Sequence, residues 1–376
     1  MSHPTRRNLL QAAGLGALAA TLGLSACSTR APAADAADAP SSGDASGTVT
    51  VTDQYGTTIE LDGPVERIAS AIIPVPSMII AADRGADRIT GINQVAAKFA
   101  QNGFLATMFP ELLQTSVIAG QDFVPNVEEI LKGNPDVVIQ WGDKGDDIVE
   151  PLRAAGLPTI LLRYGTQEDL EAWVTIFGDL LGTQDKAQRI LDTFESDRAL
   201  VARTVAGRAK PRTLHLYNAA EQTAASAAGS YMDYWIELAG GTNVAKDAGQ
   251  GTTVEITQEQ VLAWDPEVVT LGNFDPMTPA DFMADPRWST LSAVKNKRVH
   301  KVPNGGFAWD PPCNESNLMW QWAATVYHDG VDLGLRDKIR TTFDDLYGYE
   351  MSDADIDKVL HAESNAGSAR WEVLSA

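Results

Sequence analysis

The stretch that decides the fold is Val127-Glu-Glu-Ile-Leu-Lys-Gly-Asn-Pro-Asp-Val-Val-Ile-Gln-Trp141, and Gln258-Glu-Gln-Val-Leu-Ala-Trp-Asp-Pro-Glu-Val-Val-Thr-Leu-Gly272 repeats its pattern. Each stretch predicts a short amphipathic helix that opens with a glutamate, stops at an Asn-Pro or Asp-Pro turn and leads into a buried Val-Val strand. Helix–Pro–strand units are common, but here the glutamate, the proline, the acidic residue and the valine pair share one register. One unit used twice predicts two similar lobes with a cleft between them.

Strand and helix patterns alternate on both sides of the repeated stretches. Residues 48–61 predict a hairpin, and 67–73, 89–93 and 159–164 predict strands separated by helices. This order is typical of a mostly parallel sheet that is covered on both faces. From residue 183 to 210 the period is helical, which predicts one helix of roughly 20 residues and about 30 Å.

The N-terminal residues resemble an export signal. A positive segment, Ser2–Arg7, precedes an apolar run, Leu9–Leu24, that is short for a membrane span. The run ends in Leu24-Ser-Ala-Cys27, which resembles a bacterial lipobox whose Cys27 would be lipidated, and Thr5-Arg-Arg-Asn-Leu-Leu10 resembles a twin-arginine signal. An ordinary secretory signal with an incidental cysteine is the alternative. We expect export to the cell surface or the periplasm, with membrane attachment through the lipid anchor only.

The expected fold class is α/β, with two Rossmann-like lobes of mostly parallel sheet, one long α-helix joining them, and a ligand cleft between them. The expected segments are a lipoprotein signal peptide (1–26), a flexible tether (27–47), an N-terminal lobe (48–182), a connecting helix (183–210), a C-terminal lobe (211–350) and a C-terminal extension (351–376). Because a helix is a stiffer connection than paired strands, we expect ligand binding to close the cleft only slightly.

Charge and cysteine content narrow the possible partners. The formal net charge is −21 at pH 7, which argues against nucleic acid and anionic lipid and fits a partner that offers arginines or lysines. The two cysteines are Cys27 and Cys313, so lipidation of Cys27 leaves no intramolecular disulfide. We expect a monomer that is held together by its core.

Several motifs, in order, resemble one family. Val51-Thr-Asp-Gln-Tyr-Gly-Thr-Thr-Ile-Glu-Leu61 followed by Pro64-Val-Glu-Arg-Ile-Ala-Ser70 is similar to the opening of periplasmic-type binding proteins for iron–siderophore, haem and vitamin B12 uptake. The stretch from Pro125 to Ile139, Leu238-Ala-Gly-Gly-Thr-Asn-Val-Ala245 and Arg298-Val-His-Lys-Val-Pro303 also match. The resemblance covers roughly Thr48 to Tyr349. It implies a non-enzymatic receptor that delivers a metal chelate to the permease subunits of an ABC importer.

Two glutamates occupy the same place in the two repeated units. In the resembling family, one glutamate on each lobe meets arginines of the importer, and by motif position these are Glu128 and Glu259. Each is expected in the first turn of its helix, where the helix dipole favours a carboxylate, so two ordinary solvated glutamates are the alternative. Glu129 competes with Glu128 for the first role.

The carboxyl ends of the predicted strands, and the loops near them, point to a ligand site. Aromatic rings there can cover a chelate, while amide, hydroxyl and guanidinium groups orient it. Trp141 and Trp309 are interpreted as ligand contacts; for Tyr164, Tyr217, Tyr231 and Phe274, core packing is an equal alternative. The full expected set is Trp141, Arg163, Tyr164, Tyr217, Tyr231, Asn273, Phe274 and Trp309.

The ligand expected at this site is an iron(III)–siderophore-type chelate. Arg163 is the one cation in the expected set, which favours a neutral or weakly charged ligand such as a ferric hydroxamate or a corrinoid. Receptors for cobalamin, haem or molybdate with the same fold are alternatives.

The sequence gives little support for a receptor of bare metal ions or for an enzyme. Cys313 is either a soft metal ligand or, more simply, a small packing residue. The remaining histidines, His215, His300, His328 and His361, are scattered, so we expect no bare-metal site and no cofactor. No G-x-S-x-G, H-E-x-x-H or phosphate-loop pattern supports an exported hydrolase, which is the alternative from another class.

Overall fold

The computed structural model describes residues 47–219 and 223–375. The predicted signal peptide with Cys27, and nearly all of the predicted tether, lie outside the described residues. All of these described residues belong to one compact unit. Among the described residues, no helix is both long and apolar enough to cross a membrane.

The N-terminal lobe is built on a parallel sheet. The predicted hairpin is present as antiparallel strands β1 (Val49–Thr52) and β2 (Thr58–Leu61). The sheet has five strands, all parallel, in the order β5 (Ser116–Ala119), β4 (Ile89–Asn93), β3 (Ile68–Ser70), β6 (Val137–Trp141) and β7 (Thr159–Leu162). The helices and 3-10 turns of this lobe are α1 (Val75–Asp83), α2 (Gln94–Asn102), α3 (Leu105–Met108), η1 (Pro110–Gln114), α4 (Val127–Lys132), η2 (Asp146–Ile148), α5 (Glu150–Ala154) and α6 (Gln167–Leu181).

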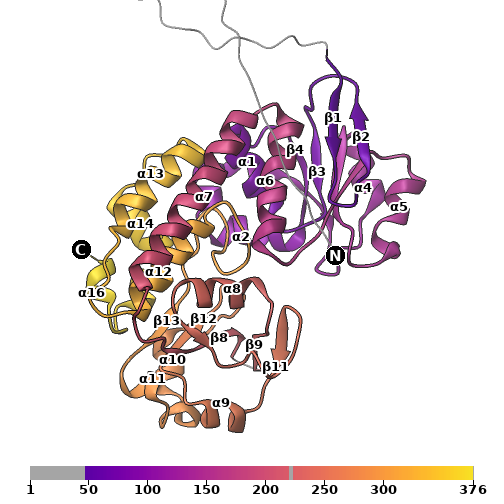
Figure 1. Ribbon diagram of the computed structural model, residues 1–376. Coiled ribbons are helices and arrows are strands. Elements are labelled where there is room, and N and C mark those ends of the chain that lie inside the picture. The colour runs from indigo at the N-terminus through magenta and orange to yellow at the C-terminus, as the bar shows by residue number, and fades with distance from the viewer. Residues whose placement is uncertain (1–46, 220–222, 376) are drawn as a thin grey trace, which may run out of the picture. The chain divides into compact units, whose positions relative to one another are not determined.

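Alternating side chains of β6 explain why both faces of this sheet are covered. Val137 and Ile139 belong to the core that contains α1 and α6, whereas Val138 belongs to the cluster that contains Ile130 of α4 and Leu152 of α5. A strand that is apolar on both faces needs helices on both sides. The Val-Val pattern in the sequence therefore predicted this layering correctly (Figure 1).

The C-terminal lobe has a mixed sheet. The order is β11 (Thr253–Glu255), β9 (Ala224–Ser226), β8 (Arg212–Asn218), β12 (Val268–Leu271) and β13 (Val299–Lys301), and β10 (Thr242–Asn243) also pairs with β8. The pairings among β8, β10, β12 and β13 are parallel, while β9 and β11 are antiparallel. Helices α8 (Tyr231–Leu238), α9 (Gln258–Trp264), α10 (Pro279–Ala284) and α11 (Ser292–Lys295), with the turn η3 (Pro286–Trp288), complete this part of the lobe.

The internal repeat is also present in the structure. In both α4–β6 and α9–β12, a residue in the left-handed conformation follows the helix and precedes the strand. Asn134 has a φ of 44° and Asp265 a φ of 41°. Asn and Asp tolerate this left-handed conformation better than other residues with a side chain. Each of the two stands directly before a proline, which cannot continue the helix.

One arginine ties each copy to the strand beside it. Arg67, directly before β3, pairs with Asp136 at 2.5 Å, and Arg212, the first residue of β8, pairs with Glu267 at 3.3 Å. The main-chain N–H groups of the two arginines donate to the same two carboxylates at 2.8 and 3.0 Å. The two copies lie in separate sheets. Both lobes thus use the same residue types at the same corner, as a duplicated unit would.

The predicted connecting helix is α7 (Gln184–Val205), a single element of 22 residues. Ala187, Ile190, Phe194 and Val201 are its buried apolar residues, at the spacing of one helix face. The helix packs against α6 in the first half of the chain and against α8 and α12 (Ser316–Tyr327) in the second half (Figure 1).

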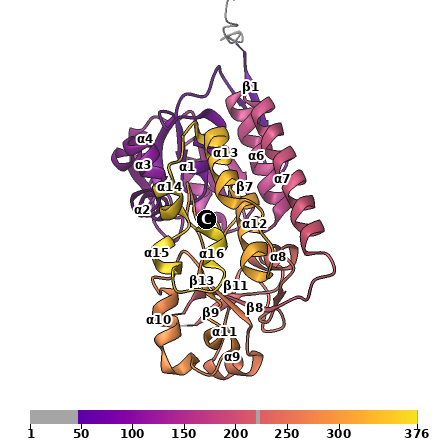
Figure 2. The same ribbon diagram turned by 90° about the vertical axis from the view of Figure 1, so that its left-hand side faces the viewer.

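A second connection, which the sequence did not reveal, runs back to the N-terminal lobe. Helix α13 (Leu335–Tyr347) packs against α1 as well as α12 (Figure 2). The guanidinium of Arg84 donates to the carbonyl oxygens of Asp344 and Asp345, and the Lys186 ammonium of α7 donates to that of Leu346 at 2.9 Å. Cations at the C-terminal end of a helix satisfy its free carbonyls and its dipole. The lobes are therefore joined by α7 and by α13 together.

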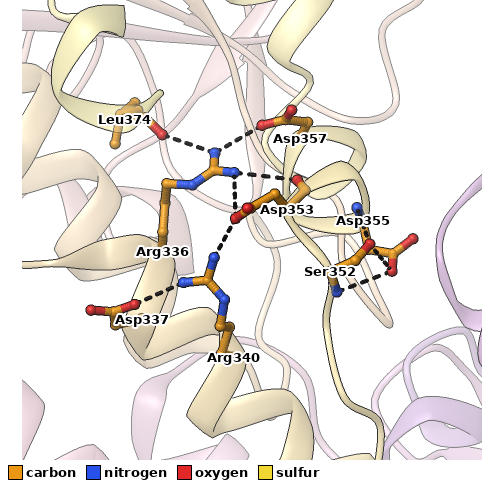
Figure 3. A network of polar contacts seen from close by, with 8 residues as sticks. All are labelled: Arg336, Asp337, Arg340, Ser352, Asp353, Asp355, Asp357 and Leu374. Atoms are coloured by element: carbon orange, nitrogen blue, oxygen red, sulfur yellow. Dashed lines mark hydrogen bonds and ion pairs between the residues drawn. The ribbon is translucent and has the colours of Figure 1, made fainter. Parts of the chain in front are cut away.

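The C-terminal extension belongs to the folded body. It contains α14 (Asp353–Val359), α15 (Ala362–Asn365) and α16 (Trp371–Leu374). Arg336 of α13 donates to the Asp357 carboxylate at 2.8 Å and to the carbonyl oxygen of Leu374 at 3.3 Å, and it also pairs with Asp353 (Figure 3). Arg340 pairs with Asp353 as well (Figure 3). Two arginines of one helix thus hold both ends of the extension.

Candidate ligand site

A cavity of about 200 Å³ lies where the strand ends of the two sheets meet. Trp141 is the last residue of β6, and Tyr164 follows β7 by two residues; from the other lobe, Tyr217 lies at the end of β8 and Phe274 follows β12 by three residues. This is the place at which ligands bind in open α/β sheets. The remaining lining residues are Ile73, Pro74, Phe123, Lys144, Met232, Thr252, Phe307, Asp310, Pro311 and Pro312.

Aromatic rings form the walls of this cavity. The Trp141 and Tyr164 rings meet edge to face with centroids 5.6 Å apart, and the Tyr217 and Phe274 rings stack at 5.0 Å. Phe99 of α2 reaches across from the N-terminal lobe, with its centroid 4.9 Å from that of Phe274. Four of the six predicted aromatic residues therefore come together from both lobes, and a ring contact joins the lobes beside them.

The two cavity tyrosines are neutral phenols. Burial, with a contribution from Asp310, raises the pKa of Tyr217 to about 12, and burial likewise raises the pKa of Tyr164. Neither hydroxyl has a hydrogen-bond partner in the described part of the chain. Both are therefore available to donate or accept a hydrogen bond from a ligand.

Arg163 and Tyr231 line an adjoining groove of about 490 Å³, which shares Tyr164 and Thr252 with the cavity. The Arg163 side chain is half exposed, and its Nε lies 3.1 Å from the Asp169 carboxylate. Its other guanidinium N–H groups have no partner among the described residues and can bind a ligand. Tyr231 is buried, and its hydroxyl donates to the Gln167 amide oxygen at 3.2 Å. Arg163 thus faces the groove, whereas Tyr231 is largely a packing residue.

Asn273 and Trp309 do not line the cavity. Asn273 lies behind Asp310, and its amide donates to the Asp310 carboxylate at 2.8 Å and to the Pro303 carbonyl at 2.9 Å. Trp309 is completely buried, and its indole N–H donates to Glu315 at 2.5 Å. The expectation that Trp309 contacts the ligand is therefore replaced by a core role, because Glu315 draws the indole inward.

Cys313 is also buried in the core and does not line the cavity, which agrees with its interpretation as a packing residue. Burial raises the pKa of its thiol well above the usual value, so the thiolate that binds metals is disfavoured. In the described ranges, no group of three or more His, Cys, Asp or Glu side chains could hold a metal ion.

Asp310 is the functional candidate that sequence reasoning missed. It follows Trp309 in Trp309-Asp-Pro-Pro312, and both prolines line the cavity with it. Two consecutive prolines hold the chain in an irregular conformation before α12. An acid in front of such a pair, after the Gly305-Gly306 turn, was the signal that could have identified it.

Glu128 and Glu259 both lie in the first helical turn, as expected. The Glu128 side chain is 83% exposed and lies 3.3 Å from Lys132, whereas Glu129 is more buried and holds the same lysine at 2.6 Å. Glu259 is exposed in the first turn of α9 and has no ion-pair partner among residues 47–219 and 223–375. The two equivalent carboxylates are thus accessible, and Glu128 is more accessible than its neighbour.

The fold and the cleft define a solute receptor, and sequence comparison agrees. The chain belongs to the periplasmic binding protein family, whose sequence model matches residues 76–304. Members of this family bind small molecules outside the cytoplasm and work with the permeases of ABC importers; they are not enzymes. The resemblance noted from the motifs is confirmed, and the exported-hydrolase alternative is excluded.

The relatives differ in what they bind. Molybdate-binding protein MolA of Haemophilus influenzae is 21% identical over 63% of this chain and 68% of its own length. A cobalamin-binding protein of Halobacterium salinarum is 29% identical over 60% of this chain, and iron(3+)-hydroxamate-binding protein FhuD of Bacillus subtilis is 25% identical over 51%. The matched regions span 58% and 64%, respectively, of the lengths of these last two relatives.

Among solved structures, a periplasmic solute binding protein from Veillonella parvula superposes with a TM-score of 0.77 at 29% identity. The superposition covers 85% of this chain and 99% of that one. Two lobes with a cleft between them are therefore the shared architecture.

Proposed function

We propose that this protein captures an iron(III)–siderophore-type chelate and delivers it to an ABC importer. The observation that carries the proposal is the cavity walled by Trp141, Tyr164, Tyr217 and Phe274 from both lobes. Rigid aromatic rings cover the apolar periphery of a chelate at a low cost in conformational entropy. The relative named for iron(3+)-hydroxamate binding supports the same ligand class.

The dimensions require the ligand to extend beyond the cavity. Its volume of about 200 Å³ is below the range of about 300–1,000 Å³ that is usual for ligand pockets. The groove of about 490 Å³ adjoins it at Tyr164 and Thr252, which line both spaces. A chelate would place its apolar side in the cavity and its more polar side in the groove, next to Arg163.

The ligand is tested by purifying the protein from its own host and measuring its metal content and absorption spectrum. Iron with a ligand-to-metal charge-transfer band supports the proposal. A Soret band, cobalt with a corrin spectrum, or molybdenum would contradict it and would indicate the haem, cobalamin or molybdate alternative instead. Replacing Trp141 by Ala should weaken rebinding of the released ligand, while Trp264→Ala, outside the cavity, should not.

Glu128 and Glu259 are proposed to dock on arginines or lysines of the two permease subunits. Each lies exposed in the same turn of a duplicated unit, so the two lobes carry matched negative charges. Opposite charges on two partners accelerate and orient their association. The double change Glu128→Lys and Glu259→Lys should abolish uptake and leave chelate affinity intact; lost affinity would refute the assignment. Glu60→Lys, at an exposed site on β2, is the matched control.

We further propose that Cys27 carries a lipid after removal of residues 1–26, and that the receptor acts as a monomer on this anchor. The lipobox-like Leu24-Ser-Ala-Cys27 supports the anchor. Changing Cys27 to Ala should release the protein from the membrane fraction and abolish metabolic labelling with a radioactive fatty acid. Retained labelling would contradict the assignment, and a dimer in size-exclusion chromatography would contradict the monomer.

A further inference from the structure

Among the described residues that line the cavity, Asp310 is the one acid, and its side chain is 1% exposed to solvent. Its carboxylate is held by Asn273, whose amide donates to Oδ1 at 2.8 Å and whose main-chain N–H donates to Oδ2 at 3.3 Å. The absence of a side chain at Gly272 makes room for it, because a Cβ there would stand 2.9 Å from Oδ2. The carboxylate is therefore positioned on the cavity wall rather than left mobile.

The groups behind Asp310 do not neutralise it by contact. His215 Nε2 lies 3.8 Å from Oδ2, which is too long for a hydrogen bond. Burial lowers the pKa of His215 to about 4, so the ring is neutral at physiological pH. Lys301 donates to the carbonyl oxygens of Gly272 and Asp275 instead of to the Asp310 carboxylate.

A carboxylate can accept about four hydrogen bonds, and Asp310 has two donors within residues 47–219 and 223–375. A buried charge without a full set of partners is costly unless a partner arrives from elsewhere. The cavity is the open side of this group, so that partner would come from the ligand.

The aromatic walls favour the same kind of ligand group. The faces of Trp, Tyr and Phe rings attract cations. The structure already shows such a contact at the mouth of the cavity, where the Lys144 ammonium lies 5.9 Å from the centroid of the Tyr164 ring. Lys144 is exposed, so water screens its charge far more than that of the buried Asp310.

We propose that the cavity selects a ligand group that is cationic or rich in N–H donors, and that Asp310 is the residue that recognises it. An oxyanion such as molybdate is then a poor ligand, because its charge would meet a buried carboxylate. This inference rests on the proposed function and adds a detail to it. The chelate would bind with an ammonium or amide N–H group inside the cavity, next to Asp310.

Two single-ring fragments of opposite charge, benzylammonium and benzoate, test the inference without knowledge of the natural ligand. Their binding to the full-length, ligand-free protein is followed by saturation-transfer NMR and by the intrinsic tryptophan fluorescence. The wild type should bind benzylammonium at least tenfold more tightly than benzoate, and Asp310→Asn should reduce that preference to less than about twofold. Asp146→Asn, an exposed acid outside the cavity, should keep the full preference.

Equal binding of the two fragments by the wild type, no binding of benzylammonium, or an unchanged preference in Asp310→Asn would each overturn the inference. If the variant fails to fold, the wild-type comparison still tests the charge preference, because equal binding of the two fragments would overturn the inference. The outcome is independent of the metal analysis: a protein purified with iron but without charge preference would retain the proposed function and lose only the role of Asp310.

Discussion

At the scale of single residues, Glu315 explains why Trp309 is buried and does not line the cavity, and it also makes the stability of the protein depend on pH. Its carboxylate is fully buried and accepts hydrogen bonds from the Gly306 N–H at 2.8 Å, the Trp309 indole at 2.5 Å and the Tyr347 hydroxyl at 2.5 Å. Burial outweighs these donors and raises the pKa of Glu315 to about 7. The group thus holds the Gly305-Gly306 turn and α13 together, and it titrates near neutral pH.

The stability contributed by Glu315 should fall as pH rises from about 4.5 to about 7. Because the folded pKa lies above the usual value of 4.5, the folded state binds the proton more tightly than the unfolded chain across this window. The free energy of unfolding of the wild type, minus that of Glu315→Gln, should therefore decrease by up to ~3 kcal/mol over this range. Urea denaturation at a series of pH values measures it.

Subtracting the free energy of unfolding of Glu315→Gln from that of the wild type cancels the contribution of the histidines to the pH dependence. Burial lowers the pKa of His215 to about 4 and that of His300 to about 3, so these residues add stability as pH rises toward 6.5 in both proteins alike. Asp179→Asn, at an exposed site on α6, is the matched control for the removal of one carboxylate. A wild-type advantage that grew with pH would show that the carboxylate, not the acid, is the favoured form.

Trp141 and Trp309 show how far single residues can be interpreted from sequence. Both follow or precede strand-like segments near turns, and both were expected in the cleft. Trp141 lines the cavity because it ends β6, a place that its own sequence neighbours determine. Trp309 is buried because Tyr347 and Glu315, one of them distant in the chain, form a polar centre that attracts its N–H. Local sequence carries the first kind of information and not the second.

At the scale of elements, one buried acid of α7 links this helix to two others. Asp197 is 5% exposed, accepts a hydrogen bond from the Asn317 amide of α12 at 2.8 Å and forms an ion pair with the Lys338 ammonium of α13 at 2.8 Å. It is the point at which the connecting helix meets both returning helices.

Changing Asp197 to Ala should lower the free energy of unfolding by ~2–4 kcal/mol, because it leaves a buried amide and an ammonium without their acceptor. Urea denaturation measures the loss. Asp192→Ala, which removes an exposed acid from the same helix, should cost less than ~0.5 kcal/mol. Equal losses in the two variants would mean that helix propensity, not the buried contact, sets the stability of α7.

The elements that sequence predicted well are those with a strong period. The Val-Val strands, the hairpin and α7 were all evident, since apolar spacing alone defines them. Strands β9 and β11 have three residues each and little apolar character, so the sequence shows no pattern that predicts them. The packing of α13 on α1 was equally hidden, because the apolar pattern of a helix shows that one face is buried but not which helix covers that face.

At the scale of the whole folded unit, one continuous core spans both lobes. It includes Val137 and Ile139 of the first sheet and Val268 of the second, together with residues of α7, α12 and α13. A shared core leaves little freedom for the lobes to rotate, because interiors are close-packed and deform at a cost. The expectation of slight closure, drawn from α7 alone, gains a second reason in α13.

The radius of gyration should therefore be the same, within experimental error, for the protein loaded with its host-derived ligand and for the stripped protein. Solution X-ray scattering of the two preparations makes the comparison. The paired change Glu195→Gly and Ser196→Gly, at exposed positions in the middle of α7, should weaken the helix by ~1 kcal/mol per glycine and widen the range of lobe positions in the stripped state. Glu195→Ala with Ser196→Ala is the matched control and should behave as the wild type. A clear compaction of the wild type on loading would show that the lobes move about a hinge despite their common core. The two helical connections would then be flexible and not rigid.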